Sequence, residues 1–308
     1  MLEHWALFIY IRDALLSFMY PRSFEYFSPK TLREAFELLH GRDSEVRVLA
    51  GGQSLIPSLK SRSIGLKGVV DITLIKELDY VRRDGRVLRI GALTTNAVLE
   101  TNKEVVSLLP ILREAAGQIA DPLVRNMGTI GGNLCYADPV NDLPAVMLVL
   151  NATMVVAGRE GTRKINADSF FVDSFKTALK SEEILTEIEI PLEKGKVGGA
   201  YLKVKKGSGG FSIAAVASYL SVAEGDTISS CRIALGAVGP KAVRASEAER
   251  SLQGKVPGAS DLDTAAKFSV EASQPISDIT ASEDYRRKVL YKLVKGAIST
   301  SYHRASGM

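Results

Sequence analysis

Cysteine is scarce in this sequence, since Cys135 and Cys231 are the only two among 308 residues. Two distant thiols cannot build a disulfide framework, a four-thiolate zinc site or an iron–sulfur cluster unaided. Histidine is scarce too: His4, His40 and His303 show no metal-ligand spacing and are expected on the surface. The sequence therefore predicts no metal site in this chain and a reducing, cytoplasmic setting.

The sequence also lacks a long hydrophobic run. The apolar stretch 5–11 is interrupted at once by Arg12 and Asp13, and it is far shorter than the ~20 residues that cross a bilayer. The same region has neither the basic start nor the small-residue cleavage pattern of a secretory signal. We therefore expect no membrane span and interpret residues 1–18 as an N-terminal extension, with a peripheral helix as the alternative.

No charge of one sign dominates the composition. The 39 Lys and Arg residues oppose 35 Asp and Glu residues, for a formal net charge of +4 at pH 7. A nucleic-acid interface needs a concentrated basic patch, whereas these basic residues are dispersed along the chain. At 46% hydrophobic and 24% charged residues, the chain is globular and long enough for about two domains. Nucleic acid is not expected as a partner.

The pattern of short elements changes near residue 194. Before it, strand-like runs alternate with helical periodicity, at 46–50, 69–72 and 87–90 for strands and at 96–109 and 110–119 for helices. After a glycine-containing boundary at 195–199, the order is strands first and helices second. These strands are predicted at 200–204, 213–222 and 231–238, and the helices near 242–252, 261–273 and 282–299. Strands followed by segregated helices predict an α+β domain.

Two glycine-rich segments carry the chemical signal. Residues 51–54 read Gly-Gly-Gln-Ser after a strand, and residues 128–133 read Gly-Thr-Ile-Gly-Gly-Asn. Adjacent glycines let consecutive backbone N–H groups approach a phosphate, so both segments are candidates to bind a pyrophosphate. Neither has the lysine of a Walker loop, and no Gly-x-Gly-x-x-Gly follows a strand, which disfavours a Rossmann domain. A single Gly-Gly pair most often makes only a turn.

Three ordered motifs carry a more specific signal: residues 50–57 (AGGQSLIP), 129–133 (TIGGN) and 138–144 (DPVNDLP). Together they resemble the FAD-binding medium subunit of the molybdenum hydroxylases, a family that includes carbon monoxide dehydrogenase, xanthine dehydrogenase and aldehyde oxidoreductases. The resemblance extends from about Tyr20 to Tyr302.

The resemblance implies an α+β fold in which a two-subdomain FAD-binding domain of the p-cresol methylhydroxylase type precedes a small C-terminal flavoprotein domain. The FAD-binding domain then corresponds to 19–193, with subdomains at about 19–74 and 75–193, and the C-terminal domain to 194–308. The latter is expected to contain a three-stranded antiparallel sheet and a helical bundle.

The resemblance also implies noncovalently bound FAD, because no histidine is well placed to attach it. Asp142 is expected to accept hydrogen bonds from FAD hydroxyl or ring groups, Lys203 to contact the flavin, and Ile119 and Leu185 to make apolar contacts. Without the resemblance, Lys203 would be interpreted as an exposed strand lysine. The residues expected to cradle the pyrophosphate are Ala50, Gly51, Gly52, Gln53, Ser54, Leu55, Ile56, Pro57, Gly128, Thr129, Ile130, Gly131, Gly132 and Asn133.

Some positions depart from the family pattern. Many members have His or Thr where Gln53 stands, which leaves the electron acceptor open. Two distant cysteines exclude the additional iron–sulfur loop of some members. Cys135 lies close to the second glycine segment, and a buried structural thiol is favoured there over a redox partner.

The function implied is that of an FAD-binding electron-transfer subunit, which passes electrons from [2Fe–2S] clusters to an external acceptor in an aldehyde, purine or CO oxidising complex. The chain offers no nucleophile–base pair, so no catalytic residue is expected and substrate hydroxylation belongs elsewhere. The implied partners are a small iron–sulfur subunit and a large molybdopterin subunit in a dimer of heterotrimers. Two alternatives remain open: a free-standing FAD-dependent oxidase or reductase acting on a small organic substrate, and a nucleotide-sensing module.

Overall fold

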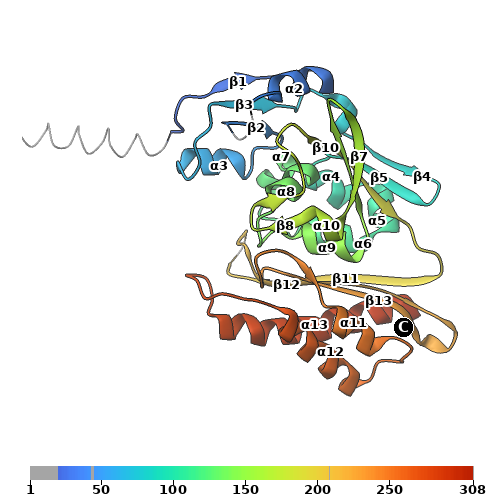
Figure 1. Cartoon of the computed structure of the whole chain (residues 1–308). Coiled ribbons are helices and arrows are strands. Elements are labelled where there is room, and N and C mark those ends of the chain that lie inside the picture. The colour runs from blue at the N-terminus through green and yellow to red at the C-terminus, as the bar shows by residue number, and fades with distance from the viewer. Residues whose placement is uncertain (1–19, 43–44, 208, 308) are drawn as a thin grey trace, which may run out of the picture.

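The computed structural model describes residues 20–42, 45–207 and 209–307, so the extension predicted at 1–18 lies outside the described residues. The elements form three layers stacked along the long axis of the molecule (Figure 1). Within the described ranges, no helix is both long and apolar enough to cross a bilayer. Most strands pair antiparallel, and in the last third of the chain the strands come before the helices, as the α+β prediction requires.

The first layer is a small parallel sheet with helices beside it. Its strands are β1 (Glu25–Phe27), β3 (Gly68–Asp71) and β2 (Val46–Leu49), paired in that order. Helix α2 (Leu32–Leu39) follows β1, and α3 (Leu55–Lys60) follows β2 directly after the first glycine segment. Parallel pairing places the carboxyl end of β2 and the segment after it at the side facing the second layer.

The second layer is a five-stranded antiparallel sheet covered by short helices. Its order is β4 (Val81–Asp84), β5 (Val87–Gly91), β10 (Ile184–Pro191), β6 (Thr153–Gly158) and β7 (Gly161–Asn166). The helices that pack on it are α4 (Asn96–Thr101), α5 (Lys103–Leu108), α6 (Pro110–Gly117), α7 (Pro122–Met127), α8 (Ile130–Tyr136) and α9 (Leu143–Val149). A short segment of α10 (Ala167–Phe170), β8 (Phe171–Asp173) and β9 (Lys176–Thr177) completes it.

The helix expected over 96–109 is divided in two. Asn102 ends α4 and begins α5, because its side-chain oxygen accepts hydrogen bonds from the backbone N–H groups of Glu104 at 3.0 Å and Val105 at 3.4 Å. A side chain that satisfies these donors competes with a continuous helix. The periodicity of apolar residues is the same on both sides of the break, so it did not signal the interruption.

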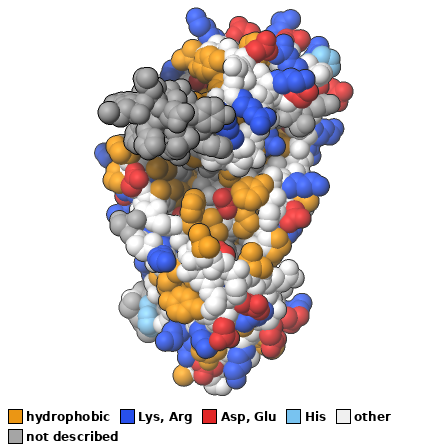
Figure 2. Space-filling view, turned by 90° about the vertical axis from the view of Figure 1, so that its left-hand side faces the viewer, with side chains coloured by type: hydrophobic (Ala, Val, Ile, Leu, Met, Phe, Trp, Pro, Cys, Tyr) orange, Lys and Arg blue, Asp and Glu red, His pale blue; other side chains and the backbone are white. Residues whose placement is uncertain are grey.

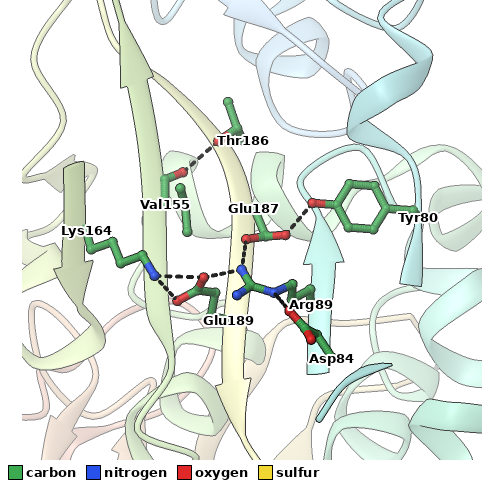
Figure 3. Close-up of polar contacts among 8 residues, drawn as sticks. All are labelled: Tyr80, Asp84, Arg89, Val155, Lys164, Thr186, Glu187 and Glu189. Carbon is green, nitrogen blue, oxygen red and sulfur yellow. Dashed lines mark hydrogen bonds and ion pairs between the residues drawn. The ribbon is translucent and has the colours of Figure 1, made fainter. Parts of the chain in front are cut away.

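Strand β10 shows how alternation sorts side chains between the two faces of this sheet. Ile188 and Ile190 are completely buried in the core beneath the helices. Glu187 and Glu189 lie on the opposite face, where Arg89 donates to both and Lys164 pairs with Glu189 at 2.7 Å (Figure 3). This face therefore carries a closed network of opposite charges.

The third layer is an antiparallel sheet with a helical layer on its outer face. Strands β11 (Lys196–Lys205), β12 (Ser212–Val222) and β13 (Ile228–Gly236) confirm the three predicted strands, and the two-residue strand β14 (Val243–Arg244) extends the edge. Helices α11 (Ser246–Leu252), α12 (Ala259–Ala272) and α13 (Glu283–Ser306) pack below them (Figure 1).

Strand β12 is apolar on both faces because both faces are covered. Ala215 and Tyr219 belong to the core shared with the second layer, whereas Val216 and Leu220 pack in the core beneath α13. The third layer is thus joined to the second by a buried interface, and β11 lies along that interface.

Candidate functional site

A cleft of about 590 Å³ lies where the three layers meet. Its walls come from β2 and the segment after it, from α7 and α8, from the 140–142 loop, and from β10 and β11. This volume lies within the range of small-molecule and cofactor sites.

The first glycine segment lines this cleft and presents free backbone donors to it. Within the described residues, the N–H groups of residues 51–54 make no hydrogen bond. Gly52 has φ +71°, a conformation that glycine adopts without strain. Four consecutive unpaired N–H groups beside a cavity suit an anion such as a phosphate.

The second glycine segment begins helix α8, and most of its backbone N–H groups are already used. Gly131 donates to Ala92 O at 2.9 Å, Gly132 donates to Thr129 Oγ1 at 3.1 Å, and Asn133 donates to Thr129 O at 3.0 Å. Thr129 is therefore an N-cap, and residues 131–133 have few donors left for a ligand. Sequence reasoning treated the two segments as equivalent, whereas their hydrogen bonding differs.

The glycines have a second role, which is close backbone packing against neighbouring segments of the chain. A Cβ atom on Gly51 would lie 1.9 Å from Met127 O, and one on Gly131 would lie 2.6 Å from Ala92 O. No real side chain fits at either distance. These two glycines thus allow the backbone to approach other parts of the same chain.

A buried ionic cluster forms the opposite wall of the cleft. Asp142 Oδ2 lies 2.7 Å from Lys203 Nζ, while Asp142 Oδ1 accepts from Tyr201 OH at 2.5 Å and from Ser212 Oγ at 2.9 Å. Only 2% of the Lys203 side chain is exposed, so it is not a surface strand lysine. The Asp142 carboxylate is occupied by three donors of its own chain, which leaves it less free to accept from a ligand than we expected.

Burial shapes the protonation of this cluster. It lowers the pKa of Lys203, although the charge and hydrogen bond of Asp142 act in the opposite direction. It also raises the pKa of Tyr201, and the adjacent Asp142 adds to that effect. Tyr201 therefore stays a neutral hydrogen-bond donor to the carboxylate.

Cys135 also borders the cleft, on α8. Burial raises the pKa of its thiol to about 12, so the thiol is protonated at neutral pH. Both Cys135 and Cys231 are free. A protonated thiol is a weak nucleophile, which agrees with a structural role.

The structure brings most of the predicted FAD residues together. Those that line the cleft are Ala50, Gly51, Gly52, Gln53, Ser54, Leu55, Ile119, Gly128, Thr129, Gly131, Gly132, Asn133, Asp142, Leu185 and Lys203. Ile56, Pro57 and Ile130 do not line it: the first two lie inside α3, and Ile130 is fully buried in the core. Each belongs to a predicted segment, but its side chain turns away because neighbouring positions of a helix face different directions.

Several cleft residues were not predicted from the sequence. They include Asn96 on α4, Val124 on α7, Tyr136 on α8, and Phe175 and Phe211 in loops. Asn96 begins the helical run predicted over 96–109, which contains several other polar residues, so its polarity alone did not single it out. The others come close only through the packing of the layers.

Comparison with known families covers nearly the whole chain. Residues 22–193 match the model described as the FAD binding domain in molybdopterin dehydrogenase, and residues 199–301 match the CO dehydrogenase flavoprotein C-terminal domain. This chain belongs to the family of FAD-binding medium subunits of the molybdenum hydroxylases. The resemblance drawn from the three sequence motifs is thereby confirmed.

Two curated relatives show how close the medium subunits are. The chain is 36% identical to the carbon monoxide dehydrogenase medium chain of Hydrogenophaga pseudoflava, over 94% of this chain and 100% of the relative. It is 39% identical to the glyceraldehyde dehydrogenase medium chain of Sulfolobus acidocaldarius, over 91% of this chain and 98% of the relative.

Solved structures agree with this assignment. A carbon monoxide dehydrogenase structure from Hydrogenophaga pseudoflava matches with a TM-score of 0.91 at 38% identity, covering 93% of this chain and 100% of the other. Quinoline 2-oxidoreductase from Pseudomonas putida 86 matches with a TM-score of 0.88 at 32% identity, covering 93% and 99%. The medium subunit is thus an FAD-binding component of a multi-subunit oxidoreductase, separate from the molybdenum subunit.

Proposed function

We propose that this medium subunit binds FAD noncovalently in the cleft and relays electrons from the [2Fe–2S] clusters of a partner subunit to an external acceptor. The row of unpaired N–H groups at residues 51–54 is the observation that carries the proposal. Those groups suit the pyrophosphate of a dinucleotide, and the cleft extends from them to Lys203. FAD, when bound, supplies the redox chemistry.

The residues of the cleft fit such a ligand at both ends. Ile119 and Leu185 are buried apolar residues of its wall, suited to a planar ring system. Lys203 provides a cation, held by Asp142, that would favour the electron-rich form of a ring placed beside it. No histidine lines the cleft within the described ranges, which is consistent with noncovalent binding.

The names of the relatives argue that this subunit does not choose the substrate. Proteins that are 33–39% identical to this chain carry names referring to carbon monoxide, glyceraldehyde and caffeine. Substrates that differ this much would not bind in one shared pocket, whereas every one of these oxidations requires an electron-transfer step. We therefore place substrate oxidation, in an aldehyde, purine or CO oxidising complex, on a large molybdopterin subunit.

The surface around the cleft suits a partner protein. Figure 2 shows hydrophobic side chains on both sides of the hollow on this face. Phe175 and Phe211 line the cleft and are 56% and 70% exposed, and Leu123 on α7 is 79% exposed. Exposed apolar groups around a site are typical of an interface. We assign this rim to the small iron–sulfur subunit, within a cytoplasmic dimer of heterotrimers.

Co-expression with the two partner subunits tests the proposal. We expect a stable complex that contains FAD, iron and molybdenum, in which substrate reduces first the iron–sulfur clusters and then the flavin. An isolated yellow monomer that oxidises a small organic substrate would support a free-standing oxidase instead. Nucleotide binding without any redox turnover would support the nucleotide-sensing alternative.

A further inference from the structure

Asn96 is a buried polar residue that has no partner in its own chain. It is the first residue of α4, it lines the cleft, and only 2% of it is exposed. Its backbone N–H donates to Gly128 O at 2.8 Å, but its side-chain amide makes no hydrogen bond within the described residues. Thr95 already caps this helix by accepting from Val98 N at 3.3 Å, so α4 does not need the Asn96 side chain.

An unpartnered amide in a protein interior is costly, and native structures rarely retain one without a reason. The Asn96 oxygen Oδ1 is fully enclosed. The Nδ2 group is not among the enclosed unpaired atoms and has no partner in the described chain, so it is the end of the amide that a ligand can reach.

The position of the amide indicates which part of a ligand it meets. Asn96 Nδ2 lies 3.0 Å from the point where a Cβ atom of Gly128 would be, and Gln53 Cγ lies 3.6 Å from that same point. The amide is therefore located where the two glycine segments meet. On the side of the second segment, the backbone N–H groups of residues 131–133 are used internally, so donors to a ligand there come from side chains such as Asn96.

We propose that Asn96 is a cofactor-binding residue whose Nδ2 group donates a hydrogen bond to the pyrophosphate of FAD. Phosphate oxygens only accept hydrogen bonds, and the exposed end of this amide only donates. The residue then supplies, from α4, a side-chain donor next to residues 131–133, whose own backbone N–H groups are already used. The inference rests on the proposed function, because it assumes that the cleft binds FAD.

Asn96→Leu distinguishes this role from a structural one, because the two roles predict opposite effects on the flavin-free protein. Leucine has nearly the same shape and removes the unpaired oxygen, so the urea midpoint of the flavin-free full chain should stay equal or rise. The Kd for FAD should increase by about 10- to 100-fold, the loss typical of a hydrogen bond to a charged group.

Asn102→Leu is the matched control. The Asn102 amide is satisfied by the N–H groups of Glu104 and Val105 and does not line the cleft. Its replacement should lower the urea midpoint and leave the Kd for FAD unchanged. Asn96→Ala serves as the second variant if the leucine side chain prevents folding. It should increase the Kd for FAD in the same way.

Competition by ADP and by riboflavin identifies the ligand group that Asn96 binds. Asn96→Leu should weaken the binding of ADP, which contains the pyrophosphate, and leave the binding of riboflavin unchanged. An unchanged Kd for FAD, an unchanged affinity for ADP, or a lowered urea midpoint of the flavin-free variant would each overturn the inference. Absence of FAD binding by the wild-type chain would instead contradict the proposed function, so the two failures are distinguishable.

Discussion

Replacing Lys203 by methionine should destabilise the flavin-free protein, because it leaves Asp142 buried without its cation. The two side chains are 2% and 7% exposed and lie 2.7 Å apart. Removal of one member of a buried ion pair costs about 3–5 kcal/mol. Asp142 keeps the hydrogen bonds from Tyr201 and Ser212, so we expect a loss near the lower end, ~3 kcal/mol.

Urea unfolding of four chains measures this effect. Wild type, Lys203→Met, Asp142→Asn and the double variant form a double-mutant cycle, in which the double variant should regain most of the stability because it contains no unpaired charge. Lys196→Met is the control on the same strand: that lysine is 60% exposed and 3.4 Å from Asp226, and its loss should cost less than about 1 kcal/mol. The m value is the slope of the unfolding free energy against urea concentration. If it is equal in all of these proteins, the substitutions changed only stability.

The same variants make a prediction for the flavin. Lys203→Met leaves a net negative charge at the cleft wall, so the flavin midpoint potential should fall and iron–sulfur reduction should be followed by slower flavin bleaching. The double variant restores neutrality and should recover much of the potential. A loss below about 1 kcal/mol in Lys203→Met, or a double variant as unstable as the sum of the two single ones, would refute the reasoning about the pair.

Three further outcomes follow from the geometry. Gly131→Val should destabilise the flavin-free protein itself, since its Cβ atom would lie 2.6 Å from Ala92 O; a wild-type urea midpoint with only FAD lost would contradict this. Thr129→Ala removes the N-cap of α8 and should cost about 1 kcal/mol by the same assay, whereas an unchanged midpoint would argue against the cap. Burial raises the pKa of Cys135 and Cys231 to about 12, so neither thiol should react with an aromatic disulfide reagent at pH 8 until the chain unfolds.

Local patterns predicted the elements of this protein well. The strand-like run predicted at 213–222 matches β12, and the predicted order of strands followed by helices is that of the third layer. These features depend on the periods of 2 and 3.6 residues with which side chains change direction, which a sequence displays directly. Where a side chain competes with the backbone, as Asn102 does, the period alone missed the break.

The sequence by itself determined the family and the two glycine segments, because those signals lie in contiguous residues. Only the tertiary structure decided which of them keeps free donors: residues 51–54 remain unpaired, whereas Gly131 bonds to Ala92 on another element. It also joined Asp142 to Lys203, which are 61 positions apart. Such contacts depend on how three layers pack, and packing selects partners by position in space, which no local pattern of residues encodes.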